Sequence, residues 1–153
     1  MDHEKFMAEA LKEAEKAALQ GEVPVGAVVV LKGEIIGRGY NLRETLADPT
    51  AHAEIIALKE AARSLKNWQL KDCTLYVTIE PCPMCAGAIY QARIKTLVYG
   101  APDLKAGAVD TLFDLVRNPR LNHRVEVISG VLAAEASKII TDFFREKRNR
   151  GKF

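Results

Sequence analysis

The segment Pro81-Cys82-Pro83-Met84-Cys85 constrains the fold of this chain more than any other. Two cysteines three positions apart place two sulfur ligands on one side of a single helical turn, directly after a run of residues typical of a strand. Thirty residues before Cys82, His52 can supply an imidazole nitrogen, and zinc prefers this mixture of sulfur and nitrogen ligands. The fold must therefore bring a helix start near residue 52 against another helix start near residue 82.

Three protein ligands leave a fourth position on a tetrahedral zinc ion, which a water molecule can occupy. The metal lowers the pKa of that water and makes it a nucleophile at neutral pH. Glu54, two residues after His52, lies close to this site without being needed as a ligand. We expect Glu54 to take the proton from the water and return it to a leaving group.

A Cys-x-x-Cys pair has two other common uses. A strand followed by this pair at the start of a helix is also typical of a thioredoxin-like redox site, which needs no upstream histidine or glutamate. A purely structural zinc site would need a fourth protein ligand, and the remaining candidates are Cys73, His3 and His123. Cys73 begins a predicted strand, so we expect it to be a small buried residue. The presence of His52 and Glu54 favours the catalytic interpretation.

The length of 153 residues suits a single domain, residues 1–153, with one hydrophobic core. No apolar run approaches the length of a membrane span, and residues 1–5 lack the basic and apolar regions of a signal peptide. Three cysteines, two of them spaced as ligands, fit a reducing compartment. We therefore expect a cytoplasmic protein without a membrane segment.

Hydrophobic periodicity and turn residues predict five helices and five strands. The helices are expected at 2–20, from Asp48-Pro49 to about 65, at 82–92, 109–116 and 132–148, and the strands at 25–31, 34–41, 73–79, 96–99 and 124–128. This order predicts an α/β protein with a mixed five-stranded sheet and helices on both faces. The connection 100–123 is long enough for a helical crossover, so we expect the last two strands to be parallel.

Four longer segments surround these motifs: 23–27 (Val-Pro-Val-Gly-Ala), 48–54 (Asp-Pro-Thr-Ala-His-Ala-Glu), 75–82 (Leu-Tyr-Val-Thr-Ile-Glu-Pro-Cys) and 121–125 (Leu-Asn-His-Arg-Val). Through them the chain resembles the zinc-dependent nucleobase deaminases, and among these the bacterial tRNA-specific adenosine deaminases, over nearly its whole length. The resemblance implies a three-layer α/β/α cytidine-deaminase-like fold. It also implies one zinc ion per chain, held by His52, Cys82 and Cys85, and a homodimer.

The same resemblance implies hydrolytic deamination of adenosine to inosine at the wobble position of a tRNA anticodon, by a zinc-activated water with Glu54 as the catalytic residue. The expected partner is the anticodon stem-loop of an arginine tRNA. By resemblance, Asn41 hydrogen-bonds the target base, Asn122 and His123 touch the RNA near it, and Lys105 lies in a loop that contacts the substrate. Without the resemblance, Asn41 would be a turn residue and His123 a loop histidine with a satisfied hydrogen bond.

Basic residues are concentrated at the C-terminal end. Residues 138–153 hold six basic and two acidic side chains, a net charge of +4, in a chain whose total charge is +2. Such a segment is compatible with contacts to phosphate groups. It is more often a solvated helix end, where basic residues are favoured.

Two alternative functions remain open. One is a deaminase of a free nucleobase or nucleoside, such as guanine, cytosine or cytidine. The other is a zinc-stabilised RNA-binding module without catalysis. Glu54 argues against the binding module, because a structural zinc site has no use for that residue.

Overall fold

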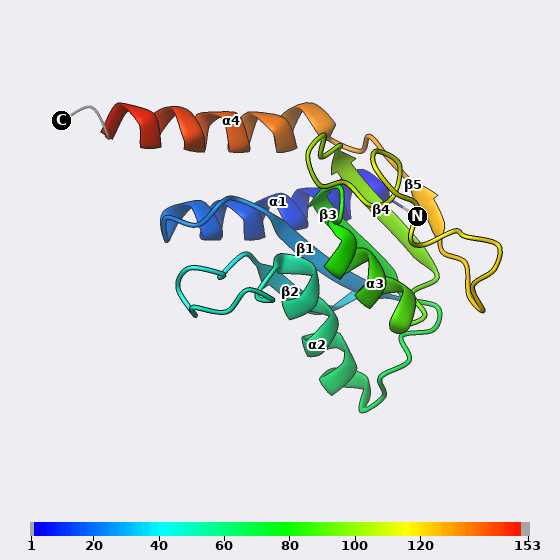
Figure 1. The fold of residues 1–153 in the computed structure, drawn as a ribbon. Helices are drawn as coiled ribbons and strands as arrows, with labels where there is room; N and C mark the ends of the chain where they lie inside the picture. Colours follow the sequence, from blue (N-terminus) through cyan, green and yellow to red (C-terminus); the bar gives the residue numbers. More distant parts are fainter. Residues whose placement is uncertain (1, 151–153) are drawn as a thin grey trace.

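The computed structural model describes residues 2–150, which form four helices and five strands (Figure 1). In chain order they are α1 (His3–Leu19), β1 (Gly26–Leu31), β2 (Glu34–Tyr40), α2 (Ala53–Leu65), β3 (Thr74–Ile79), α3 (Pro83–Gln91), β4 (Thr96–Ala101), β5 (Glu126–Ile128) and α4 (Ala133–Arg150). None of these helices combines the length and the apolar character that a membrane span requires.

The five strands form one sheet in the order β2-β1-β3-β4-β5. β1 pairs antiparallel with both β2 and β3, whereas β3, β4 and β5 run parallel to one another. The predicted mixed five-stranded sheet and the parallel pairing of its last two strands are therefore confirmed. Because β3, β4 and β5 are parallel, the residues that follow them meet at one end of the sheet and the residues that precede them meet at the other.

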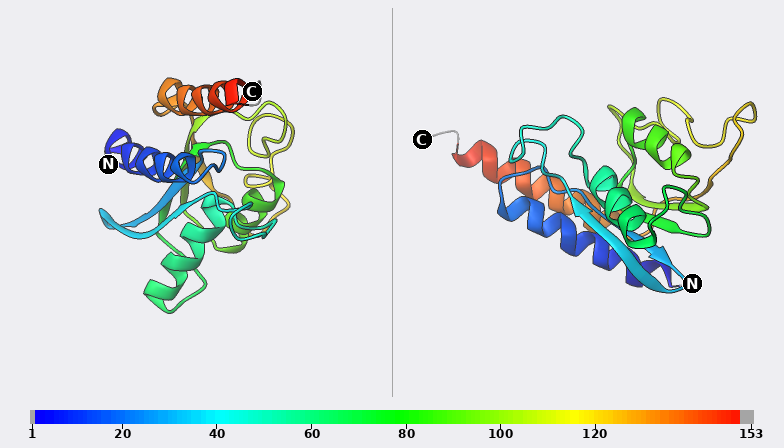
Figure 2. Two further views of the ribbon diagram at one scale, coloured as in Figure 1. Left: turned by 90° about the vertical axis from the view of Figure 1, so that its left-hand side faces the viewer. Right: turned by 90° about the horizontal axis from the view of Figure 1, so that it is seen from below.

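Helices cover both faces of the sheet (Figure 1 and Figure 2). α1 and α4 lie on one face, and α2 and α3 lie on the other. Alternate residues of β1 divide between the two layers, since Val28 contacts the apolar cluster under α1 and Val29 the cluster under α2 and α3. A strand buried on both faces requires a continuous apolar run, which residues 26–31 provide. The expected three-layer α/β/α arrangement is confirmed.

Two glycines in β2 let α2 lie directly against the backbone of the strand. A Cβ atom on Gly37 would collide with the carbonyl oxygen of Ala57, and one on Gly39 would collide with that of Ala53. Glycine weakens a strand interior, but at these two positions it permits the close approach of the helix backbone. The first residue of α2 is thereby placed beside the C-terminal end of β2.

The start of α2 differs from the prediction. The helix begins at Ala53 rather than near Asp48, and His52 occupies the N-cap position. The carboxylate of Asp48 instead accepts hydrogen bonds from the backbone N–H and the hydroxyl of Thr50, each at 2.8 Å. Local side-chain bonds of this kind compete with helix formation and hold residues 48–50 in a turn. Glu54 still lies in the first turn of α2, as expected.

The predicted helix at 109–116 is wrong. Residues 102–125, which connect β4 to β5, form turns and irregular structure. The backbone N–H groups of Val109, Asp110 and Thr111 donate to the carboxylate of Glu80, and so they bind a side chain in place of helical carbonyls. The apolar residues that suggested a helix serve the core instead, since Val109 and Val116 are fully buried.

Candidate active site

His52, Cys82 and Cys85 converge at one end of the sheet. His52 is the N-cap of α2, Cys82 is the N-cap of α3, and Cys85 lies in the first turn of α3. The Nδ1 atom of His52 lies 3.6 Å from the sulfur atom of each cysteine. The three ligand atoms lie within 4.8 Å of one another, and within residues 2–150 no other group of three or more His, Cys, Asp or Glu side chains is so arranged.

The spacing of these atoms fits a zinc ion. Bonds of about 2.3 Å to sulfur and about 2.0 Å to nitrogen, at tetrahedral angles, separate the two kinds of ligand atom by roughly 3.5 Å. The observed sulfur–nitrogen distance of 3.6 Å agrees with that geometry. The candidates for a fourth ligand lie elsewhere: Cys73 is buried in the core, and His3 bonds the hydroxyl of Tyr76. A structural zinc site needs four protein ligands, whereas a catalytic site keeps one position open.

The three ligands polarise one another. A hydrogen bond with Cys85 lowers the pKa of the Cys82 thiol to about 4, and the contact with Cys82 raises the pKa of His52. The same hydrogen bond, together with burial, raises the pKa of Cys85. Because a metal ligand must be deprotonated, zinc binding at this site has to displace the proton of Cys85.

Glu54 is a buried carboxyl group on the same helix start. It is the second residue of α2, and only 4% of its surface is exposed. Burial raises the pKa of Glu54 to about 7. A cation held by the neighbouring ligands would lower that pKa again, because positive charge favours the carboxylate form.

A cavity of about 250 Å³ opens beside these groups. His52, Cys82 and Glu54 line it together with Val23, Val25, Asn41, Arg43, Ala53, Ile79, Glu80, Asp103 and Ala106. Apolar walls with a few polar groups are typical of a pocket that takes one small planar molecule or base. Two of the three predicted metal ligands, the predicted catalytic carboxyl group and one predicted base contact therefore line a single cavity, and Cys85 is buried behind it.

Asn41 lies in the wall of this cavity, directly after β2, and is buried. Its amide nitrogen donates to the carbonyl of Val23 at 3.2 Å, and its amide oxygen accepts from the backbone N–H of Arg43 at 3.1 Å. These two bonds fix the orientation of the amide group. An amide offers two donor hydrogens and two acceptor lone pairs, so one of each remains for a ligand.

The loop after β4 forms another part of the cavity wall, at its edge toward solvent. Asp103 and Ala106 line the cavity, whereas Lys105 is exposed and is not among the lining residues. The carboxylate of Asp103 accepts the backbone N–H groups of Lys105 at 3.0 Å and Ala106 at 3.1 Å. The structure thus places Lys105 on the solvent side of the rim.

Asn122 and His123 are not brought together with the metal ligands in this chain. The Nε2 atom of His123 lies 2.7 Å from the carbonyl oxygen of Ile94, and the ring borders a separate surface pocket with Lys95 and Arg124. Lys95 precedes β4 and His123 precedes β5, whereas Cys82 follows β3. Because β3, β4 and β5 are parallel, the residues before β4 and β5 lie at the opposite end of the sheet from Cys82. A strand of six residues separates these two ends by roughly 20 Å.

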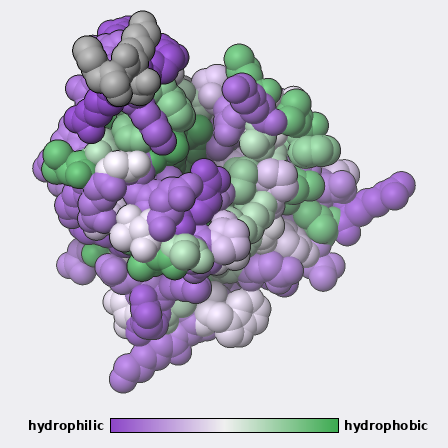
Figure 3. Space-filling model, turned by 60° about the vertical axis from the view of Figure 1, so that its left-hand side comes forward, coloured by the Kyte–Doolittle hydropathy of each residue, from purple (hydrophilic) through white to green (hydrophobic). Residues whose placement is uncertain are grey.

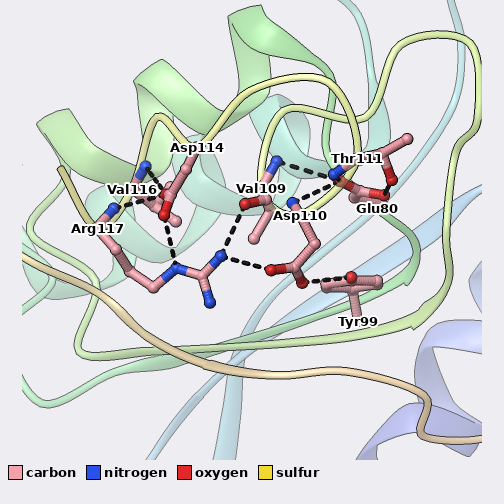
Figure 4. Close-up of polar contacts among 8 residues, drawn as sticks. All are labelled: Glu80, Tyr99, Val109, Asp110, Thr111, Asp114, Val116 and Arg117. Atoms are coloured by element: carbon pink, nitrogen blue, oxygen red, sulfur yellow. Dashed lines mark hydrogen bonds and ion pairs between the residues drawn. The ribbon is translucent and has the colours of Figure 1, made fainter.

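Two buried glutamates, Glu22 and Glu80, were missed from the sequence. They are 1% and 2% exposed, and each accepts hydrogen bonds from backbone N–H groups of a loop beside the cavity. Figure 4 shows Glu80 with its partners from the β4–β5 connection. A glutamate between an apolar strand and Pro81 is a signal of a buried acid, but no sequence pattern identifies the N–H groups that it binds.

The basic C-terminal end lies on α4. Lys147, Arg148 and Arg150 are exposed in its last turns, and Lys152 lies outside the described residues. Figure 1 shows that this part of α4 extends beyond the sheet, and Figure 3 shows hydrophilic side chains over most of the face viewed from that side. Exposed cations on a projecting helix are accessible to a polyanion.

Comparisons with known proteins identify relatives of this fold and site. A family model described as MafB19-like deaminase matches residues 1–148. The chain is 51% identical over 149 residues to the tRNA-specific adenosine deaminase of Bacillus subtilis, covering 97% of this chain and 92% of that protein. A solved structure from studies of A-to-I editing by tRNA:A34 deaminases at the wobble position matches with a TM-score of 0.85 and 45% identity, over 88% of this chain and 98% of the other. A guanine deaminase from Nitrosomonas europaea matches with a TM-score of 0.77 and 26% identity, over 92% and 83%. The cytidine-deaminase-like fold expected from the sequence is confirmed.

Proposed function

The chain belongs to the bacterial tRNA-specific adenosine deaminases, and on this premise we propose that it converts adenosine to inosine at the wobble position of a tRNA anticodon, using one zinc ion. The observation that carries the proposal is the cavity that His52, Cys82 and the buried Glu54 line together. Adenosine and water are the reactants, and inosine and ammonia are the products. His52, Cys82 and Cys85 are the residues that would hold the metal.

When bound, zinc would supply a Lewis acid that lowers the pKa of a water molecule in the cavity. Glu54 is placed to accept the proton of that water and to deliver it to the departing amine. The water oxygen forms a bond to C6 and the bond between C6 and the amine nitrogen breaks. The amine leaves as ammonia with the proton from Glu54, and the second proton of the water ends on N1 of inosine. Because Glu54 is only 4% exposed, bulk water does not compete for this proton.

Asn41 is suited to hold the base in register with these groups. Its amide is oriented by Val23 and Arg43, and it keeps one donor and one acceptor free. The edge of adenine beside the reacting carbon presents a ring nitrogen acceptor, and N7 presents a second one, so the free donor of Asn41 has a partner on the base. Two fixed bonds on the protein side reduce the conformational entropy that binding would otherwise remove.

An RNA loop fits this cavity better than a duplex does. A volume of about 250 Å³ admits one base, and a stacked, paired base cannot enter without being extruded. An anticodon loop presents partly unstacked bases, and the exposed cations of α4 offer contacts to its phosphates. We propose the anticodon stem-loop of an arginine tRNA as the substrate and the cytoplasm as the place of action, as the family resemblance implies.

We also propose that the protein acts as a homodimer. An apolar groove between α2 and α3 supports this assembly, and Trp68 beside it is 60% exposed. A surface of this kind is more often covered by a partner than left in water. Sedimentation equilibrium should give the mass of two chains, and Trp68→Lys should shift it toward one; a wild-type mass of one chain would contradict the assembly.

The test of the proposed activity is a direct comparison of substrates. Purified protein is incubated with a stem-loop carrying adenosine at the wobble position, with the same sequence paired in a duplex, and with free adenosine, guanine, cytosine and cytidine. Chromatography should detect inosine from the stem-loop, with much slower turnover of the free compounds and none of the duplex. Faster turnover of a free base or nucleoside would establish the small-molecule deaminase instead. Binding of the stem-loop without any deamination would favour the RNA-binding module.

A further inference from the structure

We infer that Glu22 and Glu80 are positioning residues, which hold two loops as opposing rims of the base cavity so that the rims can grip the nucleotides flanking the target base. The two rims are the 42–47 loop and the 103–111 loop. Their proposed task rests on the function proposed above, whereas the anchoring of the loops does not. Neither glutamate is assigned to the proton transfer or to metal binding.

Glu80 is the anchor of the 103–111 loop (Figure 4). One carboxylate oxygen accepts the backbone N–H of Asp103 at 3.1 Å and the hydroxyl of Thr111 at 2.5 Å. The other accepts the backbone N–H groups of Val109, Asp110 and Thr111, at 3.2, 2.9 and 3.0 Å. Five hydrogen bonds therefore converge on one carboxylate that is 2% exposed. Bonds to an ionised acceptor are roughly twice as strong as those between neutral groups.

Glycine at position 107 is part of the same arrangement. A Cβ atom on Gly107 would collide with the carboxyl carbon and both oxygens of Glu80. The loop therefore wraps closely around the carboxylate, and a larger residue at 107 would push the two apart. This gives a way to disturb the anchor while leaving the glutamate itself unchanged.

Glu22 anchors the opposite loop in the same way. Its carboxylate accepts the backbone N–H of Glu44 at 3.2 Å and that of Thr45 at 2.6 Å, although the residues are more than twenty positions apart. The side chain of Glu22 is 1% exposed. Residues 42–47 lie between β2 and α2 and contain no helix or strand. Their position next to the cavity therefore depends on such side-chain bonds.

What the two loops carry indicates what the anchors are for. The 42–47 loop places Arg43 in the cavity wall, and the 103–111 loop places Asp103 there. Each loop also exposes a leucine, Leu46 by 56% and Leu104 by 77%. The guanidinium of Arg43 is suited to a phosphate, and the exposed leucines of the two loops are suited to apolar contacts with unstacked bases beside the target nucleotide. Anchors that fix such groups act on substrate binding, whereas Glu54 and the metal ligands act on the reaction itself.

Three variants of the full-length zinc enzyme test the anchors away from the metal ligands: Thr111→Val, Gly107→Ala and Glu22→Gln. Each should raise KM for the stem-loop by about 2–10-fold, the worth of one hydrogen bond, while kcat and zinc content stay near wild type. Thr111→Ser keeps the hydroxyl group and should restore the wild-type KM. Thr78→Val is the matched control, because it also removes a buried threonine hydroxyl, which accepts from Gly26 on the other face of the sheet. It should lower stability and leave KM unchanged.

Hydrogen exchange provides a readout that is independent of activity. In the wild type the amides of Val109, Asp110 and Thr111 should be protected, and in Thr111→Val and Gly107→Ala they should exchange faster while those of β3 remain protected. Unchanged amide exchange and unchanged KM in both loop variants would overturn the anchoring. An equal rise of KM in Thr78→Val would show that the KM effect comes from a general loss of stability, which would also overturn it. A wild-type enzyme that leaves the stem-loop unmodified would overturn the proposed function, and the exchange measurement would still decide whether the loops are anchored.

Discussion

The ligand corner (His52, Glu54, Cys82 and Cys85) and the β4–β5 connection (residues 102–125) border the same cavity but are held by different means. In the ligand corner each side chain stands at the start of α2 or α3, and both helices bury apolar residues in the core cluster on that face of the sheet. The β4–β5 connection has no helix or strand of its own, and it is held by the carboxylates of Glu80, Asp110 and Asp114. A residue on a docked helix is positioned by many contacts, whereas a residue in the connection depends on a few.

On the function proposed above, the ligand corner serves the reaction and the β4–β5 connection serves the positioning of the substrate. Substitutions in the ligand corner should remove the reaction and leave the β4–β5 connection in place. Substitutions in the connection should move the rim and leave the metal ligands in place. The variants below are ordered by the size of the expected effect.

Removing a metal ligand should have the largest effect. Cys82→Ala takes away one of three ligands, so zinc should fall well below one ion per chain and deamination should become undetectable. Elemental analysis and the stem-loop assay measure both quantities. Amide exchange of Val109–Thr111 should stay as in the wild type, since their partner Glu80 is intact. Full zinc retention in this variant would contradict the assigned ligand set.

Removing the proton-transferring group should have the next largest effect. Glu54→Ala should keep zinc and fold but lose roughly 10²–10⁴ in rate, the usual contribution of general acid–base catalysis. Single-turnover kinetics with zinc-replete protein measure the loss without interference from substrate binding. Turnover close to wild type with zinc bound would assign the proton transfer to another group.

A substitution inside the β4–β5 connection should affect stability rather than chemistry. Asp110 accepts a hydrogen bond from the hydroxyl of Tyr99 at 2.6 Å and pairs with Arg117 (Figure 4). Asp110→Asn should lower the free energy of unfolding by about 0.5–1.5 kcal/mol, because the ion pair is partly exposed and the hydrogen bond is weakened but not abolished. Urea denaturation measures the change. Asp142→Asn is the control, since it breaks an ion pair with Lys138 on the exposed side of α4 and should cost less.

The smallest effect concerns the pH dependence of stability at Glu22. Burial alone would raise the pKa of this carboxyl group, but hydrogen bonds from Thr45 and Glu44 outweigh it and hold the pKa below its ordinary value of 4.5. A depressed pKa contributes stability above pH 4.5, and this contribution is lost as the pH falls through the folded-state value. Glu22→Gln should therefore be less stable than the wild type at pH 7, and the gap should narrow below pH 4.5. A gap that is constant with pH would show that the carboxylate charge does not matter there.

Local sequence patterns predicted most of the fold and the ligand corner. The apolar runs of β1, β3 and β4 identified the buried strands, and the spacing of Cys82 and Cys85 predicted the pair of sulfur atoms that the structure places beside His52. These features lie within a few residues of one another, so periodicity and spacing reveal them. Their assignment to catalysis stays a prediction that only the proposed experiments test.

Side-chain hydrogen bonds and the direction of β5 account for what the sequence did not reveal. Val109 to Val116 has the composition of a short helix, but Glu80, about thirty positions earlier, binds its N–H groups and holds it as turns. The start of α2 was displaced because Asp48 bonds Thr50 in place of capping a helix. By resemblance His123 was expected to touch the RNA near the target base. Within this chain it precedes β5, whose parallel direction places it at the far end of the sheet from the cavity, and its contact with RNA stays a prediction. Nothing in the local composition at these positions distinguishes the two outcomes.

The two glycines of β2 have a consequence for how this chain can vary. Gly37 and Gly39 touch no substrate and carry no chemical group, but any Cβ atom at either position would enter the backbone of α2. The helix that His52 caps and that carries Glu54 would then have to move as a body, which would displace a proposed ligand and the proposed proton acceptor together. In a library of all single substitutions, these positions should tolerate as few residues as the ligands do. Substitutions that abolish activity should therefore be found at Gly37 and Gly39 as well, where α2 packs on β2 away from the substrate.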